Sequence, residues 1–289
     1  MTRTRDNRFI SKSFAKRLNS MLRVDSRRMF TTPLFYIMCG IAFAMPILIL
    51  VMTTMTAGTT IDNPQTGAQT TMDMFTNTWQ IIASEGGNMF SMAAPAADAD
   101  MAGGAAAMGM NMDMTAMCNI NLLYFMAGVF VCLFVSEDFR SGYAKNLFTV
   151  RARKTDYVAS KTIVGFIAGA MFLICFFVGA VIGGSVAGLS FDLGAAGVSG
   201  LVMCMLAKIF LMSVFVAIFL IMSVIGKHRA WMSILLSLFL GMLLFMMIPM
   251  MTPLDSTVVN VGMTLVGGAI FSVALGAVSN MILKKSSLV

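Results

Sequence analysis

The sequence has little charge and almost no histidine, and both shortages limit what the protein can be. Only 11% of its 289 residues are charged, whereas 58% are hydrophobic and the mean hydropathy is +0.85. Soluble domains carry roughly 25% charged residues, so the composition predicts a polytopic membrane protein. The single histidine, His228, lies between Lys227 and Arg229 and is predicted to be a surface residue. We therefore expect neither a Ser-His-Asp centre nor a histidine-based metal hydrolase.

A phosphate-binding loop is also missing. No G-x-x-x-x-G-K-[ST] pattern occurs, and Gly226-Lys227 is followed by histidine without the earlier glycine. We expect no nucleotide site, no cofactor and no enzymatic activity in this chain. The five cysteines do not suggest a disulfide framework, because four of them lie inside apolar stretches, where cysteine behaves as a small hydrophobic residue; these are Cys39, Cys132, Cys175 and Cys204.

Lysine and arginine are absent from long parts of the chain. All of them except Lys208 fall within 1–30, 136–161, 227–229 and 284–285. The positive-inside rule places such segments in the cytoplasm, and the base-free segments between them are then outside. The net charge is +7. We expect the basic surface to face anionic lipid headgroups and the cytoplasm and not to bind nucleic acid.

Six apolar stretches connect these segments, and a spanning helix needs roughly 20 apolar residues. The prediction is an all-α membrane protein with six transmembrane helices, a multi-pass topology in the plasma membrane and both termini in the cytoplasm. The predicted order is an amphipathic helix on the membrane surface (1–33), the first span (34–57), an extracellular loop (58–118), the second span (119–135), a charged cytoplasmic loop (136–161), and four further spans with a short tail (162–289). The last four spans are predicted at 162–189, 198–225, 231–251 and 258–283.

The extracellular loop is rich in methionine, alanine and glycine. Thioether sulfur is a soft ligand that favours Cu(I), so a metal-related exporter is one reading of the cluster Met108, Met110, Met112 and Met114. However, the chain has 31 methionines throughout, and the loop has no histidine. We expect no metal site, and a flexible or partly helical cap that uses methionine as an adaptable apolar surface.

Lys208 is the only basic residue inside a predicted span. A charge is costly in lipid, so such a residue is a candidate for a transport pathway. The alternative is that its long side chain reaches outward to the headgroups.

The charged loop 136–161 begins with acids and ends with bases. Tyr143, Leu147 and Val150 have helical spacing, so residues 143–150 are predicted to form two turns of an amphipathic helix. A short helix held between two spans at the membrane surface would suit a soluble partner, although the loop is equally compatible with an ordinary connector.

The loop contains Glu137-Asp138-Phe139, Gly142, Lys145-Asn146, and then Arg153, Tyr157 and Ser160-Lys161. These motifs resemble those in the first cytoplasmic loop of permease subunits of type-2 ABC exporters. The family pattern is E-(D/F)-x-x-G-T-x-K-N-x-L followed by R-x-x-Y-x-x-S-K. Tyr143 stands where the family usually has threonine.

The resemblance implies a transporter subunit without its own ATPase. The partner would be a soluble ABC ATPase that binds ATP and Mg²⁺, together with a second copy or a paralogue of this chain, in contact with membrane lipid. The implied interface is Glu137, Asp138, Phe139, Arg140, Gly142, Lys145, Asn146, Arg153 and Tyr157. We expect the charges of Glu137 and Asp138 to face water, so that the fold depends little on them.

The implied substrate is an amphipathic peptide, a lantibiotic or a drug-like compound. The competing interpretation is a non-transporting membrane sensor or anchor whose outer loop binds a ligand.

Overall fold

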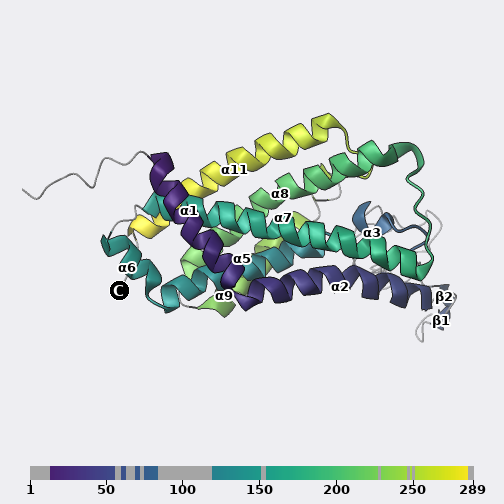
Figure 1. Cartoon of the computed structure of the whole chain (residues 1–289), viewed down its shortest axis with the longest axis horizontal. Helices are drawn as coiled ribbons and strands as arrows, with labels where there is room; N and C mark the ends of the chain where they lie inside the picture. The colour runs from purple at the N-terminus through teal and green to yellow at the C-terminus, as the bar shows by residue number, and fades with distance from the viewer. Residues whose placement is uncertain are drawn as a thin grey trace, which may run out of the picture.

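The computed structural model shows a bundle of long helices (Figure 1). It describes residues 14–55, 60–62, 69–71, 75–83, 119–150, 154–226, 229–245, 248 and 251–285. Within these ranges the chain is predominantly helical, which confirms the predicted all-α class. The helices are α1 (Phe14–Thr31), α2 (Pro33–Met55), α3 (Gln80–Ala83), α5 (Leu122–Arg140), α6 (Tyr143–Val150), α7 (Lys154–Ala187), α8 (Gly197–Gly226), α9 (Ala230–Phe245) and α11 (Val258–Lys285).

Five of these helices are long and apolar enough to cross a bilayer: α2, α5, α7, α8 and α11. A helix satisfies its own backbone hydrogen bonds, which is what a segment in lipid requires. The predicted fifth span, 231–251, corresponds to α9, an apolar helix of 16 residues. Five of the six predicted spans therefore coincide with helices that are long and apolar enough to cross a bilayer, and the helix at the predicted fifth span is shorter than predicted over the described residues.

The second span differs from its prediction in where it ends. It was expected to stop at residue 135, but α5 continues to Arg140 and includes the acidic residues Glu137 and Asp138. The short helix predicted at 143–150 is confirmed as α6.

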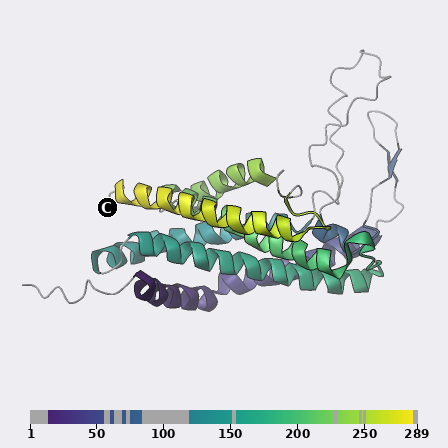
Figure 2. The same ribbon diagram turned by 90° about the horizontal axis from the view of Figure 1, so that it is seen from above.

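Glycine allows the closest helix contacts. α2 packs along α7 and α11 packs along α8, as Figure 2 shows from above. A side-chain carbon at Gly179 or Gly183 would collide with the backbone of α2 at Phe43 or Ile47. Small residues one turn apart are expected at such contacts.

The two ends of the bundle differ. α1, α6 and the last turns of α11 lie at one end, and α3 with the hairpin of β1 (Thr60–Asp62) and β2 (Gln69–Thr71) lies at the other (Figure 1). The antiparallel hairpin pairs Thr60 with Thr71. It was not predicted, because the whole segment 58–118 was expected to be a flexible or partly helical cap.

The final described part of that outer segment is anchored on the bundle. Phe75, Ile81 and Ile82 are buried. The Thr78 backbone N–H donates to Ser190 O (3.0 Å), and the Ile120 N–H donates to Ile81 O (3.0 Å). The segment 75–83 therefore belongs to the core and not to a loose cap.

Candidate functional site

Four charged side chains gather where α1, α5 and α7 meet, at the α6 end of the bundle. They are Asp25 and Arg28 of α1, Asp138 of α5 and Lys161 of α7, and we call them the charge cluster. Asp25 and Asp138 are fully buried, Lys161 is 2% exposed, and the side chain of Arg28 is 30% exposed. Two acids and two bases give the cluster no net charge, which is what burial demands.

Each base of the charge cluster contacts both acids. Lys161 Nζ lies 2.9 Å from Asp25 Oδ1 and 2.7 Å from Asp138 Oδ2. Arg28 Nη1 lies 2.7 Å from Asp138 Oδ1 and 3.9 Å from Asp25 Oδ1. The shorter Arg28 contact is an ion pair without the alignment of a hydrogen bond. The cluster therefore joins three helices through charges that have no contact with bulk water, apart from the Arg28 head.

Two hydroxyl groups of α7 complete the coordination of the acids. The Tyr157 hydroxyl donates to Asp138 Oδ2 (3.0 Å), and the Ser160 hydroxyl donates to Asp25 Oδ2 (2.6 Å). Tyr157, Ser160 and Lys161 lie on one side of the first turns of α7, because residues three and four apart share a helix face. The Y-x-x-S-K part of the family pattern, Tyr157 to Lys161, thus supplies three ligands to the charge cluster.

Aromatic rings cover the two bases. Lys161 Nζ lies 4.0 Å from the ring centroid of Phe134, and the Arg28 guanidinium carbon lies 4.2 Å from that of Tyr143 on α6. Burial alone opposes the charge of Arg28, but the pKa of Arg28 is raised by the neighbouring carboxylates of Asp138 and Asp25. Burial, and then the charge of Asp25, raises the pKa of Tyr143. At neutral pH Arg28 is thus charged and Tyr143 is neutral.

A tight turn links α5 to α6. The N–H and the hydroxyl of Ser141 both donate to Glu137 O, at 2.9 and 2.7 Å. Gly142 follows with φ = 72°, a left-handed conformation that residues with a side chain avoid. The backbone conformation therefore explains the glycine of the family motif. Crowding does not explain it, because no neighbouring atom lies within 4 Å of the position that a Cβ at Gly142 would take.

Helix α6 has one face on the bundle and one face exposed. Ala144 is buried, Leu147 and Phe148 are half-buried, and the Phe148 ring packs edge-on against Tyr157 with centroids 5.3 Å apart. Lys145 and Asn146 are exposed. With Glu137 and Arg140 at the end of α5, they form a polar surface that we call the α5–α6 surface: Glu137, Arg140, Ser141, Lys145, Asn146 and Thr149.

The structure divides the predicted interface residues into two groups. Glu137, Arg140, Lys145 and Asn146 are exposed, and Gly142 forms the turn. Asp138, Phe139 and Tyr157 are buried. The expectation that Asp138 faces water is wrong, because Arg28, Lys161 and Tyr157 neutralise and bind its carboxylate inside the bundle. Arg153 lies outside the described residues.

Helix α1 was predicted as an amphipathic helix in the headgroup plane, and its helical form is confirmed over Phe14–Thr31. It packs mainly against α7. Its buried residues Met21, Asp25 and Met29 recur every four positions, so an acid sits in the middle of the apolar stripe. A further ion pair, from Arg17 Nε to Asp156 Oδ2 (2.9 Å), ties α1 to α7.

Asp25 and Arg28 are the site residues that the sequence reading missed. The signal was present, because Asp25 is four residues from Met21 and four from Met29, on the face expected to be apolar. An acid at such a position needs a partner when buried. What the sequence did not show is that its partner is Lys161, 136 residues later.

Lys208 is fully buried in α8, so the alternative in which its side chain reaches the headgroups is wrong. Its ammonium donates to Asn121 Oδ1 (3.1 Å) and Thr252 Oγ1 (2.9 Å), and the Tyr124 hydroxyl donates to its backbone oxygen (2.8 Å). No carboxylate of the described residues pairs with it.

The methionine cluster Met108, Met110, Met112 and Met114 lies outside the described residues. Among the residues that are described, no three His, Cys, Asp or Glu side chains are grouped as a metal ion would require.

Comparison with known proteins agrees with the architecture. The family model described as ABC-2 family transporter protein matches residues 81–244, which is more than half of the chain and includes α5, α6, α7 and α8. No curated protein and no solved structure matches the chain. The match covers the α5–α6 turn and the first turns of α7, where the family motifs lie. The chain therefore belongs to the ABC-2 family of transporter proteins and is a multi-pass membrane subunit of an ABC transporter.

Proposed function

We propose that this chain is the membrane subunit of an ATP-driven exporter and that a separate soluble ABC ATPase docks on the α5–α6 surface. The observation that carries the proposal is the construction of α6: a short helix with an exposed polar face, whose inner face contacts the charge cluster directly. A plain connector between two spans needs no such contacts.

Two contacts connect α6 to the bundle. The Tyr143 ring lies over Arg28, and the Phe148 ring packs on Tyr157, whose hydroxyl binds Asp138. A displacement of α6 by the ATPase would therefore act on α1, α5 and α7 together. Because the cluster is buried and neutral, separating its members exposes unpaired charge, so the three helices are expected to move as one unit.

The proposed transport cycle uses this connection. ATP binding by two ATPase subunits, each holding Mg²⁺, would draw the α5–α6 surfaces of two permease copies or paralogues together and change the access of the pathway. A nucleotide shifts such an equilibrium only by binding one state more tightly than the other. In this orientation the α6 end, with both termini, is cytoplasmic, and the protein lies in the plasma membrane.

Lys208 is proposed to belong to the pathway. It is a buried cation with two neutral oxygen partners, between α5, α8 and the segment that precedes α11. Placing an ammonium within a membrane span is expensive, and stability alone does not require it. The exported compound is proposed to be amphipathic: a peptide, a lantibiotic or a drug-like molecule.

Co-expression with a candidate ABC ATPase tests the function. The permease should co-purify with the ATPase, and reconstitution of both in liposomes should give ATP hydrolysis that depends on the permease. A purified, folded permease that binds no such ATPase and leaves its hydrolysis unchanged would exclude the proposal in favour of a membrane sensor or anchor.

A further inference from the structure

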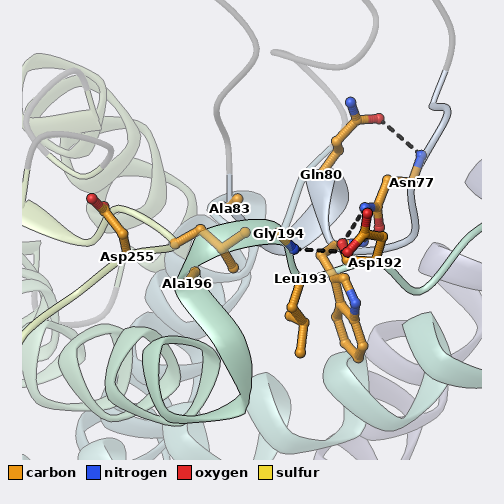
Figure 3. Close-up of a pocket in the computed structure, with 10 residues that line it drawn as sticks. Asn77, Gln80, Ala83, Asp192, Leu193, Gly194, Ala196 and Asp255 are labelled. Carbon is orange, nitrogen blue, oxygen red and sulfur yellow. Dashed lines mark hydrogen bonds between the residues drawn. The ribbon is translucent and has the colours of Figure 1, made fainter.

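A cavity of about 400 Å³ lies at the end of the bundle opposite to the charge cluster. Three connecting segments form it: the turn around α3 (Asn77, Trp79, Gln80, Ala83), the link between α7 and α8 (Asp192, Leu193, Gly194, Ala196), and the link before α11 (Leu254, Asp255) (Figure 3). Its volume is within the range of small-molecule sites, about 300–1,000 Å³.

Hydrogen bonds hold two of these segments together. The Asn77 side-chain amide donates to the backbone oxygen of Asp192, and the Thr78 N–H donates to Ser190 O (3.0 Å). The Gly194 N–H donates to Asp192 Oδ1 (2.9 Å), which orients that carboxylate. The cavity is therefore a folded feature that is fixed by contacts between residues more than 100 positions apart.

The cavity carries negative charge only. Asp192 and Asp255 lie on opposite sides of it (Figure 3), and no lining residue is basic. Asp255 is exposed and makes no hydrogen bond or ion pair with the described residues. The sequence has no Lys or Arg between Lys161 and Lys208 or between Arg229 and Lys284, so neither link supplies a base.

The rest of the lining combines two neutral amides, Asn77 and Gln80, with apolar side chains. Leu193, Leu254 and two alanines contribute hydrocarbon. Trp79 is 8% exposed and stacks on Phe177 with centroids 6.1 Å apart. Its indole Nε1 is buried and has no hydrogen-bond partner among the described residues, whereas buried indole N–H groups usually have one.

We propose that this cavity binds an organic cation, an ammonium group attached to an apolar body. The carboxylates would attract the ammonium, and the leucines and Trp79 would contact the apolar body. A metal ion fits poorly, because the two acids stand on opposite walls and no group of three ligands occurs in the described residues. The site is independent of ATPase docking, which uses the other end of the protein.

The chain contains only two tryptophans, which makes the test direct. Trp231 is 64% exposed at the start of α9, away from the cavity. In a Trp231→Phe background, Trp79 is the sole tryptophan, and its emission reports on the cavity wall. The purified protein is titrated with 2-phenylethylammonium chloride and, separately, with the matched neutral compound 2-phenylethanol.

We expect a saturable change of Trp79 emission with the amine, at lower concentration than with the alcohol, and weaker at high salt. Asp255→Asn and Asp192→Asn should each weaken amine binding about three- to fivefold, because each removes an exposed ion pair that contributes up to about 1 kcal/mol to binding. Asparagine at 192 still offers an oxygen to the Gly194 N–H, so the turn is kept. Glu137→Gln, an equal charge change at the other end, should not alter the titration.

Equal affinities for amine and alcohol would overturn the proposal. The proposal would also be overturned if the Asp192→Asn/Asp255→Asn double variant kept the parent's melting temperature and bound the amine with the parent's affinity. Loss of ATPase docking would bear only on the function proposed above, because this titration uses the permease alone.

Discussion

The charge cluster makes a quantitative prediction about Asp138. Asp138→Asn keeps the shape of the side chain but removes one of two buried negative charges. Arg28 then has only Asp25, at 3.9 Å, and the cluster becomes a net cation inside the bundle. Removing one partner of a buried pair typically costs about 3–5 kcal/mol, which corresponds to a lower melting temperature on the order of 10 °C.

The partner variant isolates the electrostatic effect. Arg28→Gln alone leaves Asp138 with Lys161, and Arg28→Gln/Asp138→Asn removes one charge of each sign and restores neutrality. The double variant should therefore be more stable than the sum of the single effects by about 1–3 kcal/mol. Glu137→Gln, one residue away but exposed, should stay within about 0.5 kcal/mol of the parent.

Thermal unfolding in detergent, followed by scanning fluorimetry, measures all four variants against the parent. If Asp138→Asn melts like Glu137→Gln, the carboxylate is not part of a buried cluster. Additive single effects in the double variant would show that Arg28 and Asp138 do not interact, and the assigned connection between α1 and α5 would be withdrawn.

Three further predictions concern the turn, the topology and the buried lysine. Gly142→Ala forces a side chain into the left-handed region at φ = 72° and should cost about 1–2 kcal/mol, visible as a lower melting temperature than for Gly142→Asn. In a cysteine-free background, a cysteine at Ala105 should react with an impermeant maleimide on intact cells and one at Ser141 should not; the reverse labelling would invert the assigned orientation. Lys208→Met should leave the melting temperature unchanged or higher, because an uncompensated buried cation is removed, while ATP-dependent export is lost; full export by this variant would remove Lys208 from the pathway.

The spans were predictable because lipid imposes a simple rule on sequence. A helix in a bilayer must be apolar over most of its length, so α2, α7, α8 and α11 begin and end within a few residues of their predicted bounds, apart from the eight residues that α7 adds at its charged start. α6 was predictable for a related reason, since Tyr143 and Leu147 repeat with the period of a helix.

The errors arose where distant residues decide the local structure. In the sequence, the acid Asp138 suggested that the span had ended and a loop had begun. α5 instead continues through Asp138, because Arg28 of α1 and Lys161 of α7 neutralise its charge. The outer cavity depends on segments 77–83, 192–196 and 254–255, whose proximity no local pattern encodes. Of the predicted interface, the exposed members keep their proposed role, and Asp138 and Tyr157 are instead part of the core.

The most direct test of the central claim is the affinity of the permease for its ATPase when the charge of the α5–α6 surface is reversed. Glu137 and Lys145 are exposed and make no ion pair in the described structure, so Glu137→Lys and Lys145→Glu should preserve the melting temperature. Like-charge contacts across an interface cost several kcal/mol, so each variant should bind the ATPase at least about tenfold more weakly. Asp255→Lys, a reversal at the opposite end, should bind like the parent. An unchanged Kd for folded Glu137→Lys and Lys145→Glu would contradict docking at this surface.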